Sequence, residues 1–133
     1  MEERPVTNVA IIRCEKNEDR CPLTGGIMAA RQETQGFAGH VDPVIMGVFT
    51  CRCPGYNVGD LARILKAKGA EVIHFPTCLF SSKRDGVWFQ GNGFCDRLEE
   101  IVKTACAASG LPCVLGTAHL PEGYEVRVLS PEA

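Results

Sequence analysis

The sequence predicts a single α/β domain, a three-layer sandwich with helices on both faces of a mainly parallel sheet of four or five strands. Short apolar runs rich in branched residues recur along the chain, as expected of buried strands. Segments with helical spacing of apolar residues separate these runs, and such alternation gives parallel strands joined by right-handed crossovers. The expected strand order is 2-1-3-4, as in flavodoxin-like and Rossmann-like folds.

The first two strand–helix units are predicted from their local patterns. Residues 8–13 read Asn-Val-Ala-Ile-Ile-Arg, a strand that ends at Cys14, and a helix is expected over about 25–35. Residues 43–50 are continuously apolar, which is typical of a strand buried on both faces. An amphipathic helix follows, with Asn57 as its expected N-cap.

The second half of the chain repeats the alternation. Residues 71–75 form the third predicted strand, and a helix is expected over about 95–108 after a polar, glycine-rich loop over 81–93. Residues 112–117 supply the fourth strand, and the tail over 121–133 is expected to be an edge strand or an extension.

Length and composition limit the class of protein. With 133 residues, 45% of them hydrophobic, the chain is expected to be one domain over residues 1–133. The net charge is -2 with both signs interspersed, so we expect no nucleic-acid partner. Because no signal peptide and no apolar stretch long enough to span a bilayer occurs, we expect a cytoplasmic protein without membrane contact.

Cysteine is the residue type that most strongly suggests function. The chain has 8 cysteines, and in a reducing compartment these indicate metal ligation or thiol chemistry rather than a disulfide framework. Because carboxyl ends of parallel strands share one edge, several of them are expected to converge there. The six candidate metal ligands are Cys14, Cys51, Cys53, Cys78, Cys21 and Cys95.

Distance decides which of these can share one ion. Neighbouring strands lie about 4.8 Å apart, and the sulfurs around a tetrahedral zinc are separated by roughly 3.8 Å. Cys14, one of Cys51 and Cys53, and Cys78 can therefore close on one metal ion. The fourth ligand is then expected to be Cys21 or Cys95, which lie in loops at the same edge.

The remaining cysteines and the histidines are assigned differently. Cys106 and Cys113 are expected to be small core residues. His74 lies within a strand and is expected to be buried and hydrogen-bonded, His119 is better placed, and both are kept as additional candidate ligands. His40 is expected to be a solvated loop residue.

Cys51 and Cys53 are separated by one residue just before a predicted helix. The positive end of that helix, and Arg52 between them, are expected to favour their thiolate forms. Three functions remain open: a zinc site, an iron–sulfur cluster, and a redox dithiol with Cys78 as the resolving thiol. The chain lacks a Cys-x-x-Cys pair, which disfavours thioredoxin-type chemistry.

Several motifs occur together in a specific combination. They are the strand ending at Cys14, the Cys21-Pro22 loop, the Gly47-Val48-Phe49-Thr50 run with Pro54-Gly55 beyond it, the Val72-Ile73-His74 strand leading to Cys78, the Gly93-Phe94-Cys95 segment and a late His119. In this combination the chain, from about Val9 to His119, resembles the CGGC domain family of small bacterial and archaeal proteins. The resemblance implies a domain rich in cysteine and histidine that is suspected of binding zinc.

The chain departs from that family at its signature. Cys51-Arg52-Cys53 stands where Cys-Gly-Gly-Cys is expected, so one residue is missing and an arginine replaces a glycine. The shorter loop puts shared ligation of one ion by this pair in doubt, although either cysteine alone can supply a ligand. We therefore expect a protein that binds a metal ion through thiolates at the carboxyl edge of the sheet, with zinc as the first choice and a thiol-redox or iron–sulfur protein as the alternative.

Overall fold

The structure is a computed structural model that describes residues 6–131. Its main sheet has five strands in the order β2-β1-β3-β6-β7, of which the first four are parallel, and β7 pairs with β6 in the antiparallel direction. The predicted α/β class and the order of the four parallel strands are confirmed, and the tail supplies an edge strand. The strands are β1 (Thr7–Cys14), β2 (Pro43–Cys51), β3 (Val72–Phe75), β6 (Cys113–Leu115) and β7 (Arg127–Leu129).

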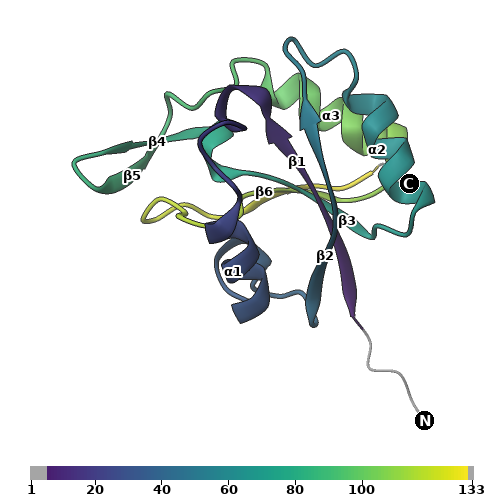
Figure 1. Cartoon of the computed structure of the whole chain (residues 1–133), viewed down its shortest axis with the longest axis horizontal. Coiled ribbons are helices and arrows are strands. Elements are labelled where there is room, and N and C mark those ends of the chain that lie inside the picture. The colour runs from purple at the N-terminus through teal and green to yellow at the C-terminus, as the bar shows by residue number, and fades with distance from the viewer. Residues whose placement is uncertain (1–5, 132–133) are drawn as a thin grey trace.

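Helices cover both faces of this sheet (Figure 1). Helix α1 (Thr24–Gln32) packs on one face, while α2 (Val58–Ala67) and α3 (Leu98–Ser109) lie together on the other. The side chains of β1 alternate between the two cores, because successive residues of a strand point to opposite faces. Val9 and Ile11 face α1, and Ala10 and Ile12 face the pair α2 and α3.

The segment expected to be a loop over 81–93 is largely a β-hairpin. Strands β4 (Ser81–Arg84) and β5 (Val87–Gln90) pair in the antiparallel direction and project from the main body (Figure 1). Asp85 and Gly86 form the turn, both with positive φ, 51° and 80°. An Asp-Gly pair between two strands is a hairpin signal, so this element could have been predicted.

Strand β2 is less buried than its apolar sequence predicts. It lies at the edge of the sheet with β1 as its single neighbouring strand, so Val44 and Val48 are 46% and 42% exposed. The apolar run therefore indicates that this segment forms a strand, but it does not indicate whether the strand lies at the centre or at the edge of the sheet.

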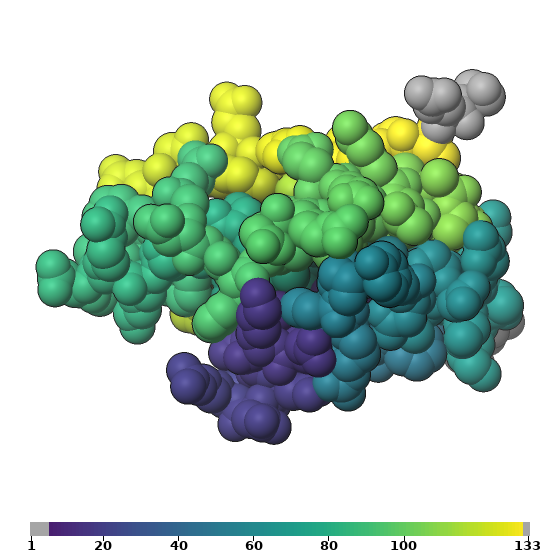
Figure 2. Space-filling view, turned by 90° about the horizontal axis from the view of Figure 1, so that it is seen from above, coloured from purple at the N-terminus to yellow at the C-terminus, as the bar shows by residue number. Residues whose placement is uncertain are grey.

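Short 3-10 turns follow β1 and β3 at their carboxyl ends: η1 (Glu15–Asn17) and η3 (Thr77–Leu79), while η2 (Gln35–Phe37) follows α1. Figure 2 looks down on this carboxyl edge, where the loop after β1, the loop after β2 and the segment before α3 adjoin one another. Within residues 6–131, no helix has the length and apolar character that a bilayer crossing requires.

Candidate functional site

Cys14 and Cys51 are the last residues of two neighbouring parallel strands. They are register partners, and both side chains belong to the core that α2 and α3 cover. Each is nearly buried, with 4% and 6% of its surface exposed. Because paired residues of parallel strands point to the same face, this pairing places the two thiols side by side, as the sequence predicts.

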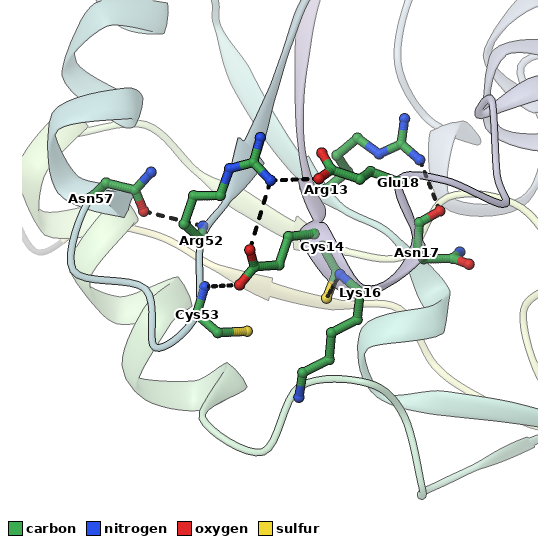
Figure 3. Close-up of polar contacts among 9 residues, drawn as sticks. Arg13, Cys14, Lys16, Asn17, Glu18, Arg52, Cys53 and Asn57 are labelled. Atoms are coloured by element: carbon green, nitrogen blue, oxygen red, sulfur yellow. Dashed lines mark hydrogen bonds and ion pairs between the residues drawn. The ribbon is translucent and has the colours of Figure 1, made fainter.

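The loop after β2 holds Cys53 against the end of β1 (Figure 3). Its backbone N–H donates a hydrogen bond to Oε1 of Glu15 at 2.6 Å. Arg52 turns away and pairs with Glu18 at 2.5 Å and with Glu15 at 3.7 Å. Asn57 occupies the N-cap position before α2, as predicted, but its side-chain oxygen accepts from the Arg52 N–H at 3.3 Å and makes no cap bond to the helix.

Cys95 reaches the same place from the segment before α3. The N–H of Cys95 donates to the Leu79 carbonyl at 3.1 Å, and the N–H of Phe94 donates to the Cys78 carbonyl at 2.9 Å. Gly93 makes this approach possible, because a Cβ there would lie 2.4 Å from the backbone of Leu79. Cys95 also packs against the core that contains Cys14 and Cys51.

These contacts define a rim cluster of four thiols: Cys14, Cys51, Cys53 and Cys95. Burial, and after it the neighbouring thiols of Cys95, Cys53 and Cys14, raise the pKa of Cys51 to about 11. The pKa of Cys95 is also raised, first by desolvation. Neighbouring thiols thus disfavour the ionisation of Cys51, Cys53 and Cys95, and a bound cation would relieve this charge repulsion.

The expectation that the helix end favours thiolates at Cys51 and Cys53 is wrong for the metal-free protein. Desolvation raises the pKa of Cys53 too, and the hydrogen bond with the Glu15 carboxylate adds to it. The positive charge of Arg52, which the sequence places between the two thiols, is offset by Glu18 and Glu15. Without a metal ion these groups are therefore neutral thiols at physiological pH.

Cys21 and Cys78 lie on the other side of Cys14. With Cys14 and His119 they line a cavity of about 200 Å³, and we call Cys21, Cys78 and His119 the cavity group. Cys78 and Cys21 are close enough to interact electrostatically, and burial raises the pKa of Cys78 to about 11. The six predicted cysteines thus converge on one edge but divide between the rim cluster and the cavity group, and Cys14 of the rim cluster also lines the cavity.

Sulfur atoms at this edge accept hydrogen bonds from N–H groups. Cys14 Sγ accepts from the N–H of Lys16 at 3.4 Å, and Cys21 Sγ accepts from the N–H of Leu23 at 3.4 Å. The side chain of Asn17 donates to Cys78 Sγ at 3.6 Å. Such bonds stabilise negative charge on sulfur, and they accompany metal-bound thiolates.

Cys106 and Cys113 behave differently, as predicted for core residues. Both are buried, and their thiols donate to main-chain carbonyls, that of Cys106 to Leu129 and that of Cys113 to Leu111, each at 3.7 Å. Cys113 lies away from the carboxyl edge, because it is the first residue of β6, and Cys106 is its neighbour.

The three histidines are placed as follows. His74 is fully buried, and its Nδ1 lies 2.8 Å from the Gly116 carbonyl oxygen, as expected for a satisfied core residue. Its Nε2 lies 2.8 Å from Nε2 of His40, so His40 is a partly buried partner and not a solvated loop residue. The ring of His119 stacks on Trp88, with centroids 5.6 Å apart.

The donor chemistry fits a thiophilic metal ion, while the present side-chain positions do not close around one. Within the described residues, no three side chains of His, Cys, Asp or Glu are close enough together to hold an ion as they stand. Because a cysteine sulfur moves through rotation about a single χ1 bond, closure of the rim cluster requires rotamer changes at its thiols.

The fold and this edge define a mainly parallel α/β protein whose strand ends carry thiols. The chain belongs to the CGGC domain family, which matches residues 8–118. No curated protein and no solved structure matches the chain, so the likeness to flavodoxin-like or Rossmann-like folds stays a prediction. Membership of this family suggests a metal-binding role.

Sequence reasoning missed several polar residues of the site. Glu15 holds Cys53, Asn17 holds Cys78, and Arg13 lines the cavity. All three lie in or next to the polar segment that follows β1. This segment has no periodic spacing of apolar residues from which a structure could be predicted. Their position within a few residues of Cys14 is the one signal that could have singled them out.

Proposed function

We propose that this protein binds a metal ion, zinc in the first place, through the rim cluster of Cys14, Cys51, Cys53 and Cys95. The observation that carries the proposal is the register pairing of Cys14 with Cys51 on one face of the sheet, with Cys95 packed against the same core. Family membership supports a metal, and an all-thiol donor set suits zinc.

The rim cluster is a better candidate than the cavity group for a cation. A zinc ion with four thiolates carries a net charge of about −2. The positive charge of Lys16 favours such a site, because it partly offsets the rise in the pKa of Cys53 and of Cys95. The cavity, by contrast, is lined by Arg13, whose positive charge repels a cation. With four protein ligands the zinc has no open position, so its role is structural.

Elemental analysis of anaerobically purified protein, with its absorption spectrum, tests the proposal. We expect about one zinc per chain and no visible absorption; iron with broad visible absorption would identify a cluster instead. Metal-free protein with titratable thiols would support the redox alternative.

Serine substitutions assign the ligands. Cys14→Ser and Cys51→Ser should lower the metal content substantially, while Cys106→Ser, which exchanges a core sulfur for oxygen, is the matched control. Cys78→Ser should leave the stoichiometry unchanged, because Cys78 belongs to the cavity group. Full metal content in both Cys14→Ser and Cys51→Ser would contradict the proposal.

A further inference from the structure

The cavity beside the rim cluster has the position and size of a small-ligand site. It lies at the carboxyl edge of the parallel sheet, where α/β proteins bind ligands. Its volume is about 200 Å³, the liquid volume of about six or seven water molecules. Gly25 forms part of its wall, and a Cβ there would lie 2.9 Å from Nε2 of His119.

Arg13 brings a positive charge to this cavity that no carboxylate offsets. Its Nη2 donates to the main-chain carbonyls of Asn17 and Cys21, which are neutral acceptors. Within residues 6–131 it forms no ion pair, and its buried Nε has no acceptor. Arg52, by contrast, pairs with two glutamates although it is more exposed. A partly buried charge without a counterion is costly, and an anionic ligand would remove that cost.

The other lining residues agree with an anion. None of those that the structure describes is acidic, and the lining includes Asn17, Thr117 and the stacked pair of Trp88 and His119. A planar guanidinium matches the oxygen pairs of carboxylates and of phosphate or sulfate.

We propose that this cavity binds a small oxyanion through Arg13. Phosphate, sulfate and carboxylate ligands share this chemistry, and their relative affinities identify which of them the cavity prefers. The residue on which this assignment depends is Arg13, which is not a member of the rim cluster, although Cys14 belongs to that cluster and also lines the cavity.

Trp88 provides a local reporter, because it is the only tryptophan of the chain and lies in the cavity lining. We would titrate the purified protein at constant ionic strength with inorganic phosphate, sulfate and acetate, and follow tryptophan emission. At least one of them should give a saturable change. Arg13→Met should weaken its binding about tenfold or more.

Arg20→Met is the matched control, since Arg20 lies in the loop that follows β1, is exposed and does not line the cavity. It should bind the anion as the wild type does. If circular dichroism shows that Arg13→Met is unfolded, Arg13→Lys takes its place, and it should bind more weakly because it lacks the planar fork. Absence of a saturable change with all three anions, or equal affinity in the Arg13 variant and the Arg20→Met control, would overturn the proposal.

Discussion

The contact between His40 and the buried His74 makes the stability of the fold depend on the protonation of these two side chains. Burial lowers the pKa of His74 to about 4, with a smaller contribution from the neighbouring His40 and against the hydrogen bond to the Gly116 carbonyl. Burial also lowers the pKa of His40. Phe37 stacks on the His74 ring with the ring centroids 4.3 Å apart, and His74 is fully buried, so its imidazole is out of contact with solvent.

The pH dependence of stability follows from this shift. The unfolded chain binds a proton at His74 near pH 6.5 and the folded chain only near pH 4, so stability should fall as the pH falls through this window. The loss between pH 7 and pH 5 should be about 2 kcal/mol. Urea denaturation at the two pH values, compared between the wild type and His74→Gln, measures it, because the variant should lose most of this dependence. An unchanged dependence in His74→Gln would show that other groups cause it.

At the scale of elements, β1 is the central support of the molecule. It pairs with β2 on one side and β3 on the other, and its side chains pack in the hydrophobic cores on both faces of the sheet. Strand β2 has one neighbouring strand and carries exposed valines. The two strands look alike in sequence, so their difference in burial arises from the topology.

Two valine-to-alanine substitutions compare these strands. Val9 on β1 is 0% exposed and Val44 on β2 is 46% exposed. Val9→Ala should lower the free energy of unfolding by about 2 kcal/mol or more, through lost burial and a residual cavity. Val44→Ala should lower it by less than about 1 kcal/mol. Urea denaturation at neutral pH measures both, and equal losses would show that β2 is covered in solution.

Local patterns were sufficient to predict most elements, since apolar periodicity and glycine stops are properties of short segments. The order of the parallel strands followed from general rules of connection. The hairpin β4–β5 was missed although Asp85-Gly86 marks its turn, because its two strands are short and little buried, and β4 is polar. The exposure of β2 depends on which strand lies beside it, which no single segment encodes.

At the scale of the whole molecule, the parallel sheet gathers cysteines that are far apart in sequence. That convergence could be predicted, because it depends only on strand direction. The division into a rim cluster and a cavity group could not, because it depends on where the segments around Cys21 and Cys95 pack. The contribution of Arg13 to the cavity was likewise hidden, since an arginine at a strand end is ordinarily solvated.

Removing the metal should destabilise the entire fold if the rim cluster holds it. The ligands come from the ends of β1 and β2 and from the segment before α3, so the ion would join three separate parts of the chain. A chelator should therefore lower the midpoint of thermal unfolding of the wild type, by an amount set by metal affinity. The Cys51→Ser protein should not respond, and a wild type that is equally insensitive would argue against a stabilising metal.

The sulfur of Cys14 borders both the rim cluster and the cavity. A side chain with one rotatable bond cannot point to two places at once, so an occupant on either side restricts the choices left to the other. Thermodynamic linkage makes such an influence mutual: whatever the metal does to anion affinity, the anion must do to metal affinity by the same factor.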